Sequence, residues 1–211
     1  SEIIYPQYLK LLDNNISVVT PNKKANKTNY KLFDKLRYYN NYRFETTVGA
    51  GLPIVDTIRN LINNGDRITK VEAILSGTMS YIFNTFSETD DSFLDVVLNA
   101  QKLGYTEPNP KDDLNGMDVM RKILIIARLS GLKLEMSDVH NNIFLSKECI
   151  ESETTEDFFS NLKLYQNNIN KLKEEASSRN KVIKHIATLQ DGVASVGLQE
   201  IDTSSPFYYL N

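Results

Sequence analysis

The sequence predicts an α+β domain in which a mixed β-sheet is covered by helices on one face, preceded by the remnant of an α/β unit. Strand-like and helix-like segments are mixed irregularly after residue 40, which is typical of α+β proteins. Residues 181–201 read as a β-hairpin around Asp191-Gly192, a favoured turn pair. The chain starts with only a helix end and one strand, which cannot form a domain alone. We therefore divide the chain into residues 1–40 and 41–211.

The first fifty residues supply the α/β remnant and the entry to the main domain. Residues 5–13 read as the end of a helix, and ISVVTPN (residues 16–22) is a short apolar run stopped by Pro21. That run predicts a buried parallel strand. A polar helix follows around residues 28–39, and RFETTV (residues 43–48) alternates like a second strand.

The main domain continues with helices that have clear start and stop signals. Pro53 suits the first position of an amphipathic helix, and Gly65 suits its end. ITKVEAILSG (residues 68–77) predicts a strand, and residues 77–86 and 92–104 predict two helices. A further helix runs from about Met117 to Leu129, with Asn115 or Asp113 as its cap. Residues 154–178 predict two amphipathic helices.

Composition favours a protein that acts on small molecules. The 211 residues carry a net charge of -3 with the lysines spread along the chain, which argues against nucleic acid and anionic membranes as partners. The single cysteine, Cys149, cannot form an internal disulfide, and the two histidines lie far apart. No apolar run is long enough to span a bilayer. We therefore expect a cytoplasmic protein.

The stretch EPNPKDDLNGMDVMRK (residues 107–122) holds seven ionisable side chains. Asp118 and Lys122 are four residues apart, so they share one face of a helix whose other residues are mostly apolar. This spacing fits a simple ion pair, and it also fits a lysine in a partly apolar cleft that exchanges a proton near neutral pH. Glu107 lies between the turn at Gly104 and Pro108, and can add a second carboxylate. Two acids and one amine suit a zwitterionic amino acid as ligand.

Four segments resemble the homoserine dehydrogenase family: VVTPNKKAN (18–26), ETTVGAGLPI (45–54), ILSGTMSYIFN (74–84) and LGYTEPNPKDDLNGMDVMRK (103–122). The resemblance is strongest to the form that is fused behind an aspartokinase. It implies the reversible, NAD- or NADP-dependent interconversion of L-homoserine and L-aspartate 4-semialdehyde, on the route to threonine and methionine. It also implies that residues 1–40 are the remnant of a Rossmann nucleotide-binding domain, and that residues 41–211 form the catalytic and dimerisation domain.

The resemblance assigns roles to individual residues. Lys122 is similar to the general acid/base of the family, and Asp118 to its partner in substrate binding and proton handling. Lys24 matches a lysine near the nicotinamide and ranks second to Lys122 for proton transfer. The remaining positions match the substrate pocket: Glu107, which would receive the substrate ammonium, with Asp113, Tyr105, Gly77 and Thr78.

The segment from Glu45 to Leu52 resembles a monovalent cation site, usually for sodium. The ligands implied are the Glu45 side chain and the backbone carbonyls of Val48, Ala50 and Leu52, and oxygen ligands suit such a hard cation. The same glycines also fit an ordinary turn.

The sequence departs from the family in one respect that matters for activity. It contains no GxGxxG motif to hold the cofactor pyrophosphate, so we expect the chain alone to bind NAD(P) weakly and to be nearly inactive. The resemblance further implies a homodimer joined through the sheet, and possible fusion to an aspartokinase in the parent protein. Two other interpretations remain open: a different two-domain dehydrogenase, and a non-catalytic dimerisation or regulatory module. Intact Glu107, Asp118 and Lys122 favour an enzyme.

Overall fold

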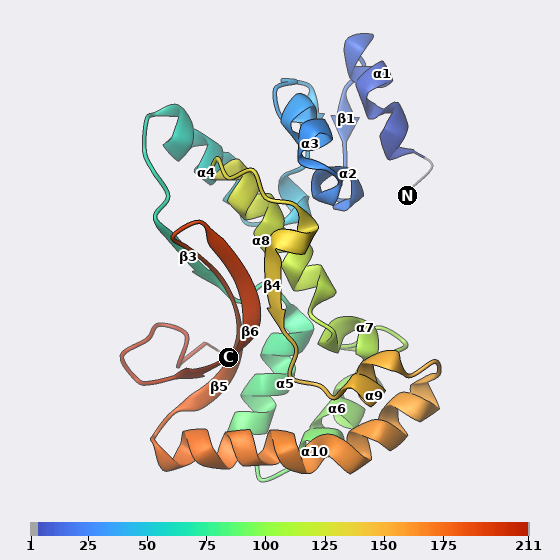
Figure 1. Cartoon of the computed structure of the whole chain (residues 1–211), viewed down its shortest axis with the longest axis vertical. Helices are drawn as coiled ribbons and strands as arrows, with labels where there is room; N and C mark the ends of the chain where they lie inside the picture. Colours follow the sequence, from blue (N-terminus) through green and yellow to red (C-terminus); the bar gives the residue numbers. More distant parts are fainter. Residues whose placement is uncertain (1–3, 211) are drawn as a thin grey trace. The chain divides into compact units, whose positions relative to one another are not determined.

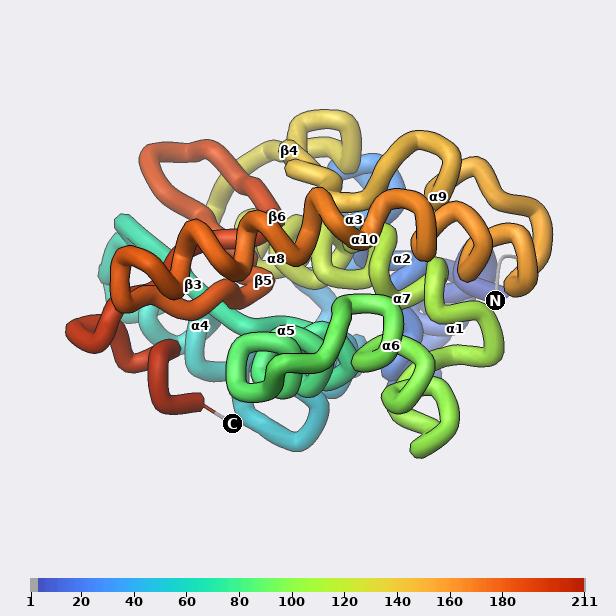
Figure 2. The backbone as a smooth tube through the Cα atoms, turned by 90° about the horizontal axis from the view of Figure 1, so that it is seen from below, coloured from blue at the N-terminus to red at the C-terminus, as the bar shows by residue number. Residues whose placement is uncertain are grey.

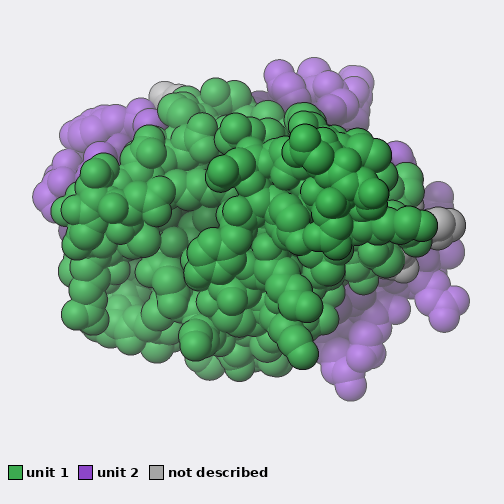
Figure 3. Space-filling model, turned by 90° about the horizontal axis from the view of Figure 1, so that it is seen from above, with its two compact units in different colours: residues 1–75, 119–140, 188–195 green, residues 76–118, 141–187, 196–211 purple. Residues whose placement is uncertain are grey.

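The structure is a computed structural model that describes residues 4–210 (Figure 1). Its chain forms two compact units, which Figure 3 distinguishes by colour. The first unit contains the described residues up to Leu75, together with Val119–His140 and Thr188–Ser195. The second unit contains Ser76–Asp118, Asn141–Ala187 and the residues from Val196 onward. Residues 4–40 share a unit with residues 41–75, and the expected domain boundary at residue 40 stays a prediction.

The first unit starts with short elements around a pair of parallel strands. In chain order these are η1 (Tyr5–Gln7), α1 (Tyr8–Asp13), β1 (Val18–Val19), α2 (Lys24–Lys27), α3 (Tyr30–Leu36), β2 (Tyr42–Arg43), η2 (Glu45–Thr47), α4 (Ile54–Asn63) and β3 (Lys70–Ala73). Val18 lies opposite Tyr42, and Val19 opposite Arg43, in a parallel register. The prediction of a parallel strand before Pro21 is therefore confirmed, but the expectation that it is buried holds only for Val18, since Val19 is 79% exposed.

Aromatic side chains form the core behind these two strands. Phe33 of α3, Tyr42 of β2 and Phe44 are at most 1% exposed. The rings of Tyr42 and Phe44 are 5.0 Å apart, and those of Phe33 and Phe44 are 6.3 Å apart in an edge-on arrangement. Such contacts add to the stabilisation from burial.

The prediction of a strand over RFETTV is wrong beyond its first residue. Strand β2 ends at Arg43, and Glu45–Thr47 form the 3₁₀ turn η2. The Thr47 hydroxyl donates to the Phe44 carbonyl at 2.7 Å, and the Glu45 carboxylate accepts N–H groups at the start of α4. These contacts hold the backbone in a turn, which the alternating pattern of side chains did not reveal.

The larger sheet has four strands in the order β3-β5-β6-β4. Strand β4 spans Val139–Asn142, and the hairpin strands β5 and β6 span Val182–Gln190 and Val193–Ile201. Asp191 and Gly192 both have positive φ, 53° and 82°, as a tight two-residue hairpin turn requires. The hairpin prediction and the α+β class with a mixed sheet are both confirmed.

The second unit is built mainly from helices: α5 (Gly77–Glu88), α6 (Phe93–Lys102), α7 (Lys111–Leu114), α9 (Lys147–Glu151) and α10 (Thr155–Ser178). Figure 2 shows α10 running along α6 and α9, and these helices are in contact. Four of these helices are capped by a hydroxyl side chain that accepts the N–H three residues further on: α5 by Ser76, α6 by Ser92, α9 by Ser146 and α10 by Thr154.

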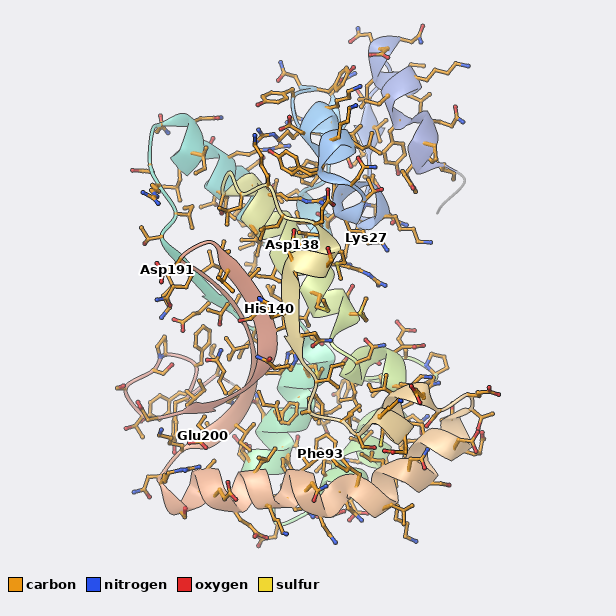
Figure 4. All side chains as sticks on the ribbon, viewed as in Figure 1. Lys27, Phe93, Asp138, His140, Asp191 and Glu200 are labelled. Atoms are coloured by element: carbon orange, nitrogen blue, oxygen red, sulfur yellow. The ribbon has the colours of Figure 1, made fainter. Side chains whose placement is uncertain are left out.

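Phenylalanines fill the core of the second unit. Phe93, labelled in Figure 4, packs edge-on against Phe86 and Phe144, with ring centres 5.2 and 6.0 Å apart. The prediction of two helices over residues 154–178 is wrong, because α10 is continuous from Thr155 to Ser178. This segment contains no proline or glycine, and Phe158, Leu162 and Ile169 bury one face along its length.

Candidate active site

Helix α8 (Met117–Leu129) carries Asp118 and Lys122 and has the bounds that the sequence predicts. Of the two expected caps, Asn115 makes the contact, since its Oδ1 accepts the Met117 N–H at 2.8 Å. Asn141 of β4 donates to the Asn115 carbonyl at 2.9 Å. Gly116 has φ +75°, and a Cβ there would lie 3.0 Å from Asn141 Oδ1. Asn141 therefore fixes the start of α8, a role that sequence reasoning missed.

Lys122 is half-buried one turn after Asp118 on α8. Its Nζ donates to the backbone carbonyl of Leu75 at 2.6 Å. The helix beyond it is almost completely buried, as expected from its apolar run. The Leu75 carbonyl orients the lysine, and a backbone acceptor of this kind leaves no signal in the sequence.

In the second unit the structure brings together several predicted substrate residues. The Glu107 N–H donates to Asp113 Oδ2 at 2.7 Å, and the Thr78 hydroxyl donates to the Tyr105 carbonyl at 2.7 Å. These bonds join the start of α5, the loop before α7 and α7 itself. Gly77 is the first residue of α5, and no atom lies within 4 Å of where its Cβ would be.

Asp113 is the half-buried centre of this group. Burial raises the pKa of its carboxyl, and the hydrogen bond from the Glu107 N–H partly offsets that rise. The charges of Asp112 and Asp118 raise the Asp113 pKa further. Negative charge is therefore concentrated around Asp113, and a cationic group such as an ammonium would stabilise it.

Lys24 lies in the first unit, just after the carboxyl end of β1. Thr20 Oγ1 accepts the Asn22 N–H at 3.0 Å, and Asn22 Oδ1 accepts the Lys24 N–H at 2.8 Å. Lys24 is the first residue of the short helix α2. Arg128 also holds this helix, because its Nη1 donates to the Asn26 carbonyl at 2.7 Å. The segment that carries Lys24 is thus fixed by two side-chain turns and one buried guanidinium.

Glu45 has a structural role that the sequence did not reveal. Its two carboxylate oxygens accept the Val55 and Asp56 N–H groups at 2.7 and 2.9 Å, at the positive end of α4. The Leu52 carbonyl, another predicted cation ligand, accepts the Ile54 N–H at 2.9 Å. The cation site predicted on Glu45, Val48, Ala50 and Leu52 stays a prediction.

The residues that sequence analysis set aside are structural or exposed. His185 is 4% exposed, and burial lowers its pKa to about 4, whereas His140 is exposed. Cys149 is a buried free thiol. Within residues 4–210, no group of three or more His, Cys, Asp or Glu side chains could hold a metal ion. No helix in this range has the length and apolar character needed to cross a membrane.

Two solved structures show which fold the chain shares. A Candida auris protein described as of unknown function is 36% identical, with a TM-score of 0.93 over 100% of this chain and 62% of that one. A putative homoserine dehydrogenase from Archaeoglobus fulgidus is 24% identical, with a TM-score of 0.72 over 96% of this chain and 57% of that one. The fold is therefore one that dehydrogenases use.

Sequence comparisons narrow the class to one family. The family model for homoserine dehydrogenase matches residues 53–211. Homoserine dehydrogenase of Saccharomyces cerevisiae is 42% identical over 96% of this chain, and the chain spans 59% of that relative. Bifunctional aspartokinase/homoserine dehydrogenase 2 of Zea mays, a chloroplastic protein, is 40% identical over 92% of this chain and 22% of its own length. The chain belongs to the homoserine dehydrogenase family, as the four sequence segments predicted.

Proposed function

We propose that this chain supplies the substrate-binding and acid–base groups for the reversible oxidation of L-homoserine to L-aspartate 4-semialdehyde, on the route to threonine and methionine. One observation carries the proposal: α8 holds Asp118 and Lys122 one turn apart, with Lys122 fixed on the Leu75 carbonyl and Asp118 adding its charge to that around Asp113. Membership of the homoserine dehydrogenase family supports it.

In this proposal the acidic residues around Asp113 recognise the ammonium group of the substrate. The charges of Asp112 and Asp118 act on Asp113, whose pKa is raised by burial and by these acidic neighbours. Glu107 is joined to Asp113 through its backbone N–H. A bound ammonium offsets that repulsion and gains charge-assisted hydrogen bonds. Tyr105 and Thr78, joined by a hydrogen bond, line the same group.

Lys122 is the proposed general acid/base. A bound nicotinamide supplies the hydride acceptor. Lys122 Nζ takes the proton of the substrate hydroxyl in the forward direction and returns a proton to the aldehyde oxygen in reverse. Asp118 orients the substrate and the amine from the preceding turn of α8. Lys24 is the second candidate for the proton transfer.

NADP or NAD is the proposed cofactor, and Lys24 is the residue of this chain that we place beside its nicotinamide. An archaeal homoserine dehydrogenase solved in complex with NADPH is similar in fold, at 22% identity and a TM-score of 0.69. Lys24 follows the carboxyl end of β1, and ligands of open α/β sheets bind at the carboxyl ends of strands. No glycine-rich phosphate turn accompanies it. We therefore expect the 211-residue chain alone to bind NAD(P) weakly and to show little turnover.

A monovalent cation, sodium in our prediction, is proposed for the turn after Glu45. Glu45 and the Leu52 carbonyl already accept hydrogen bonds, but each oxygen has a further lone pair. If the site binds sodium, replacing choline chloride by sodium chloride at equal ionic strength raises the melting temperature of the wild type. The Glu45→Gln variant should lose this difference. An equal response in both proteins would contradict the site.

Three features of the parent protein are also proposed: a homodimer joined through the sheet, possible fusion to an aspartokinase, and a cytoplasmic location. The fusion is supported by the names of several plant relatives, which are bifunctional and chloroplastic. Light scattering at micromolar concentration tests the dimer, and a monomeric mass would contradict it.

Substrate binding can be tested on the chain itself by NMR titration with L-homoserine. Glu107→Gln removes one charged acceptor and should weaken binding about tenfold, since a hydrogen bond to a charged group is worth about 1.5–3 kcal/mol. Glu153→Gln changes an exposed acid of the same unit and serves as the control. Equal affinities in the two variants would contradict the assignment of Glu107.

Catalysis needs a protein that joins this chain to an intact nucleotide-binding half. Lys122→Met should lower kcat for homoserine oxidation by about 10²–10⁴-fold and keep the KM for homoserine, whereas Lys102→Met, at an exposed lysine of α6, should leave both unchanged. If Lys24→Met shows the larger loss of kcat, Lys24 is the acid/base. A non-catalytic module, the alternative function, predicts no homoserine-dependent turnover for the wild type.

A further inference from the structure

A polar cavity lies in the first unit, on residues that have no part in the proposed reaction. Its volume is about 260 Å³. It is lined by the end of α3 and the loop that follows, by β2, by α4 and by the end of α8: Arg37, Tyr38, Tyr39, Asn40, Arg43, Arg59, Ile62, Asn63 and Leu129. None of the residues predicted for substrate, cofactor or cation binding lines it.

Three guanidinium groups line the cavity, and only Arg37 is well neutralised. Its Nε lies 2.9 Å from Asp34 Oδ1, and its guanidinium stacks on Tyr38, 4.7 Å from the ring centre. Burial and the charge of nearby Arg43 both lower the pKa of Arg59. Two like charges are therefore held close to each other.

Asp56 and Glu45 supply counter-charge to Arg59, and the Asp56 charge raises the Arg59 pKa more than the Arg43 charge lowers it. The Asp56 carboxylate lies 3.8 Å from Arg59 Nη1 and is mostly exposed, while the Glu45 carboxylate is engaged with the N–H groups of α4. The structure gives the Arg43 side chain no hydrogen bond or ion pair with any residue from 4 to 210. An anion between Arg43 and Arg59 would relieve their repulsion.

Arg59 also has an unused hydrogen-bond donor. Its Nη2 is buried and has no hydrogen-bond partner among the described residues. The guanidinium plane is fixed by the Phe44 ring, whose centre lies 4.7 Å from Cζ. Buried donors without a partner are costly, so a negative charge held near the Arg59 guanidinium would stabilise it.

We propose that the cavity binds a phosphate group, either as free phosphate or as the end of a small phosphomonoester. Guanidinium groups match phosphate oxygens with paired, charge-assisted hydrogen bonds. Asn40 and Asn63 also line the cavity, and an asparagine amide can add neutral donors. A volume of about 260 Å³ lies below the range of about 300–1,000 Å³ typical of drug-sized ligands, which favours a small anion. This site is independent of the proposed dehydrogenase reaction.

The test is calorimetric titration of the 211-residue chain with sodium phosphate at constant ionic strength. The wild type should bind one phosphate, and Arg59→Met should weaken binding by tenfold or more. Arg43→Met should do the same, and it should fold normally because its side chain is exposed and makes no hydrogen bond or ion pair within residues 4–210. Arg67→Met, at an exposed arginine of the same unit outside the cavity, is the matched control and should bind like the wild type.

Two results would overturn the proposal: no saturable binding of phosphate to the wild type, or an equal loss in Arg67→Met, which would show a non-specific charge effect. A parallel titration with O-phosphoserine distinguishes the sources of the phosphate group. Tighter binding than free phosphate identifies a phosphomonoester as the ligand, and equal or weaker binding identifies free phosphate. Both results support the site.

Discussion

Arg128 offers the sharpest test of how the first unit is held together, because its side chain is completely buried. Nη1 donates to the Asn26 carbonyl at 2.7 Å, Nε to the Leu134 carbonyl at 2.9 Å, and Nη2 to Glu135 Oε2 at 2.9 Å. Its Cζ also lies 5.5 Å from the centre of the Phe33 ring. Arg128→Met keeps the bulk of the side chain and removes every one of these donors.

The expected cost follows from these contacts. Loss of the buried bond to Asn26 leaves a carbonyl unsatisfied, at about 1–3 kcal/mol, and the half-buried bond to Leu134 is worth about 1 kcal/mol. The Glu135 side chain is 46% exposed, so that ion pair adds no more than about 1 kcal/mol. Contacts with the aromatic rings add about 0.5–1 kcal/mol. Arg128→Met should therefore lower the free energy of unfolding by about 2.5–6 kcal/mol.

Urea unfolding measures this loss. With a slope of about 2 kcal/mol per molar urea, the midpoint of Arg128→Met should fall by about 1.3–3 M. Arg67→Met replaces an exposed arginine of the same unit and should change the stability by no more than about 0.5 kcal/mol. If both variants unfold at the same urea concentration, the buried guanidinium does not support the unit and the reasoning is wrong.

Two further predictions concern the second unit. Burial lowers the His185 pKa from 6.5 to about 4, so the unfolded chain binds a proton that the folded chain excludes, and stability should fall by up to about 3 kcal/mol as pH drops from 6.5 to 4. His185→Phe should flatten this part of the pH–stability curve, and exposed His140→Phe should not; an unchanged slope in His185→Phe refutes the cause. Gly197→Ala should cost about 1–3 kcal/mol in thermal unfolding, because its Cβ would lie 2.8 Å from the Asn142 Cβ. Gly51→Ala, with open space at the Cβ, is the control, and equal stability of the two variants would contradict the clash.

The sequence predicted elements whose signals are local. Asp191-Gly192 specifies a tight turn through positive φ at both residues, and the apolar run from Met117 to Leu129 specifies one buried helix. Glu45 shows why the next strand was predicted wrongly. Its contacts are with N–H groups ten and eleven residues further on, and alternation of side chains carries no information about them.

In the candidate site, too, only features that lie in a single short segment could be predicted from the sequence. The sequence shows directly which residues are charged, such as Glu107, Asp113 and Lys122, and the resemblance to a family assigns roles to them. Their supports are not visible: Lys122 is oriented by the carbonyl of Leu75, and the start of α8 by Asn141, which is 26 residues away from its partner. A backbone acceptor has no side chain to recognise, and an asparagine in a polar stretch looks like many others.

Helix α8 links both candidate proton-transfer lysines, and this affects how their variants should be interpreted. Lys122 is on the helix itself, while Arg128, from the same helix, holds the Asn26 carbonyl in the short helix that starts at Lys24. A change at Arg128 should therefore displace the Lys24 segment without touching Lys122. If Lys122 is the acid/base, Arg128→Lys in an active protein should raise the KM for cofactor more than it lowers kcat. If Lys24 transfers the proton, kcat should fall instead, so this one variant separates the two assignments without removing either amine.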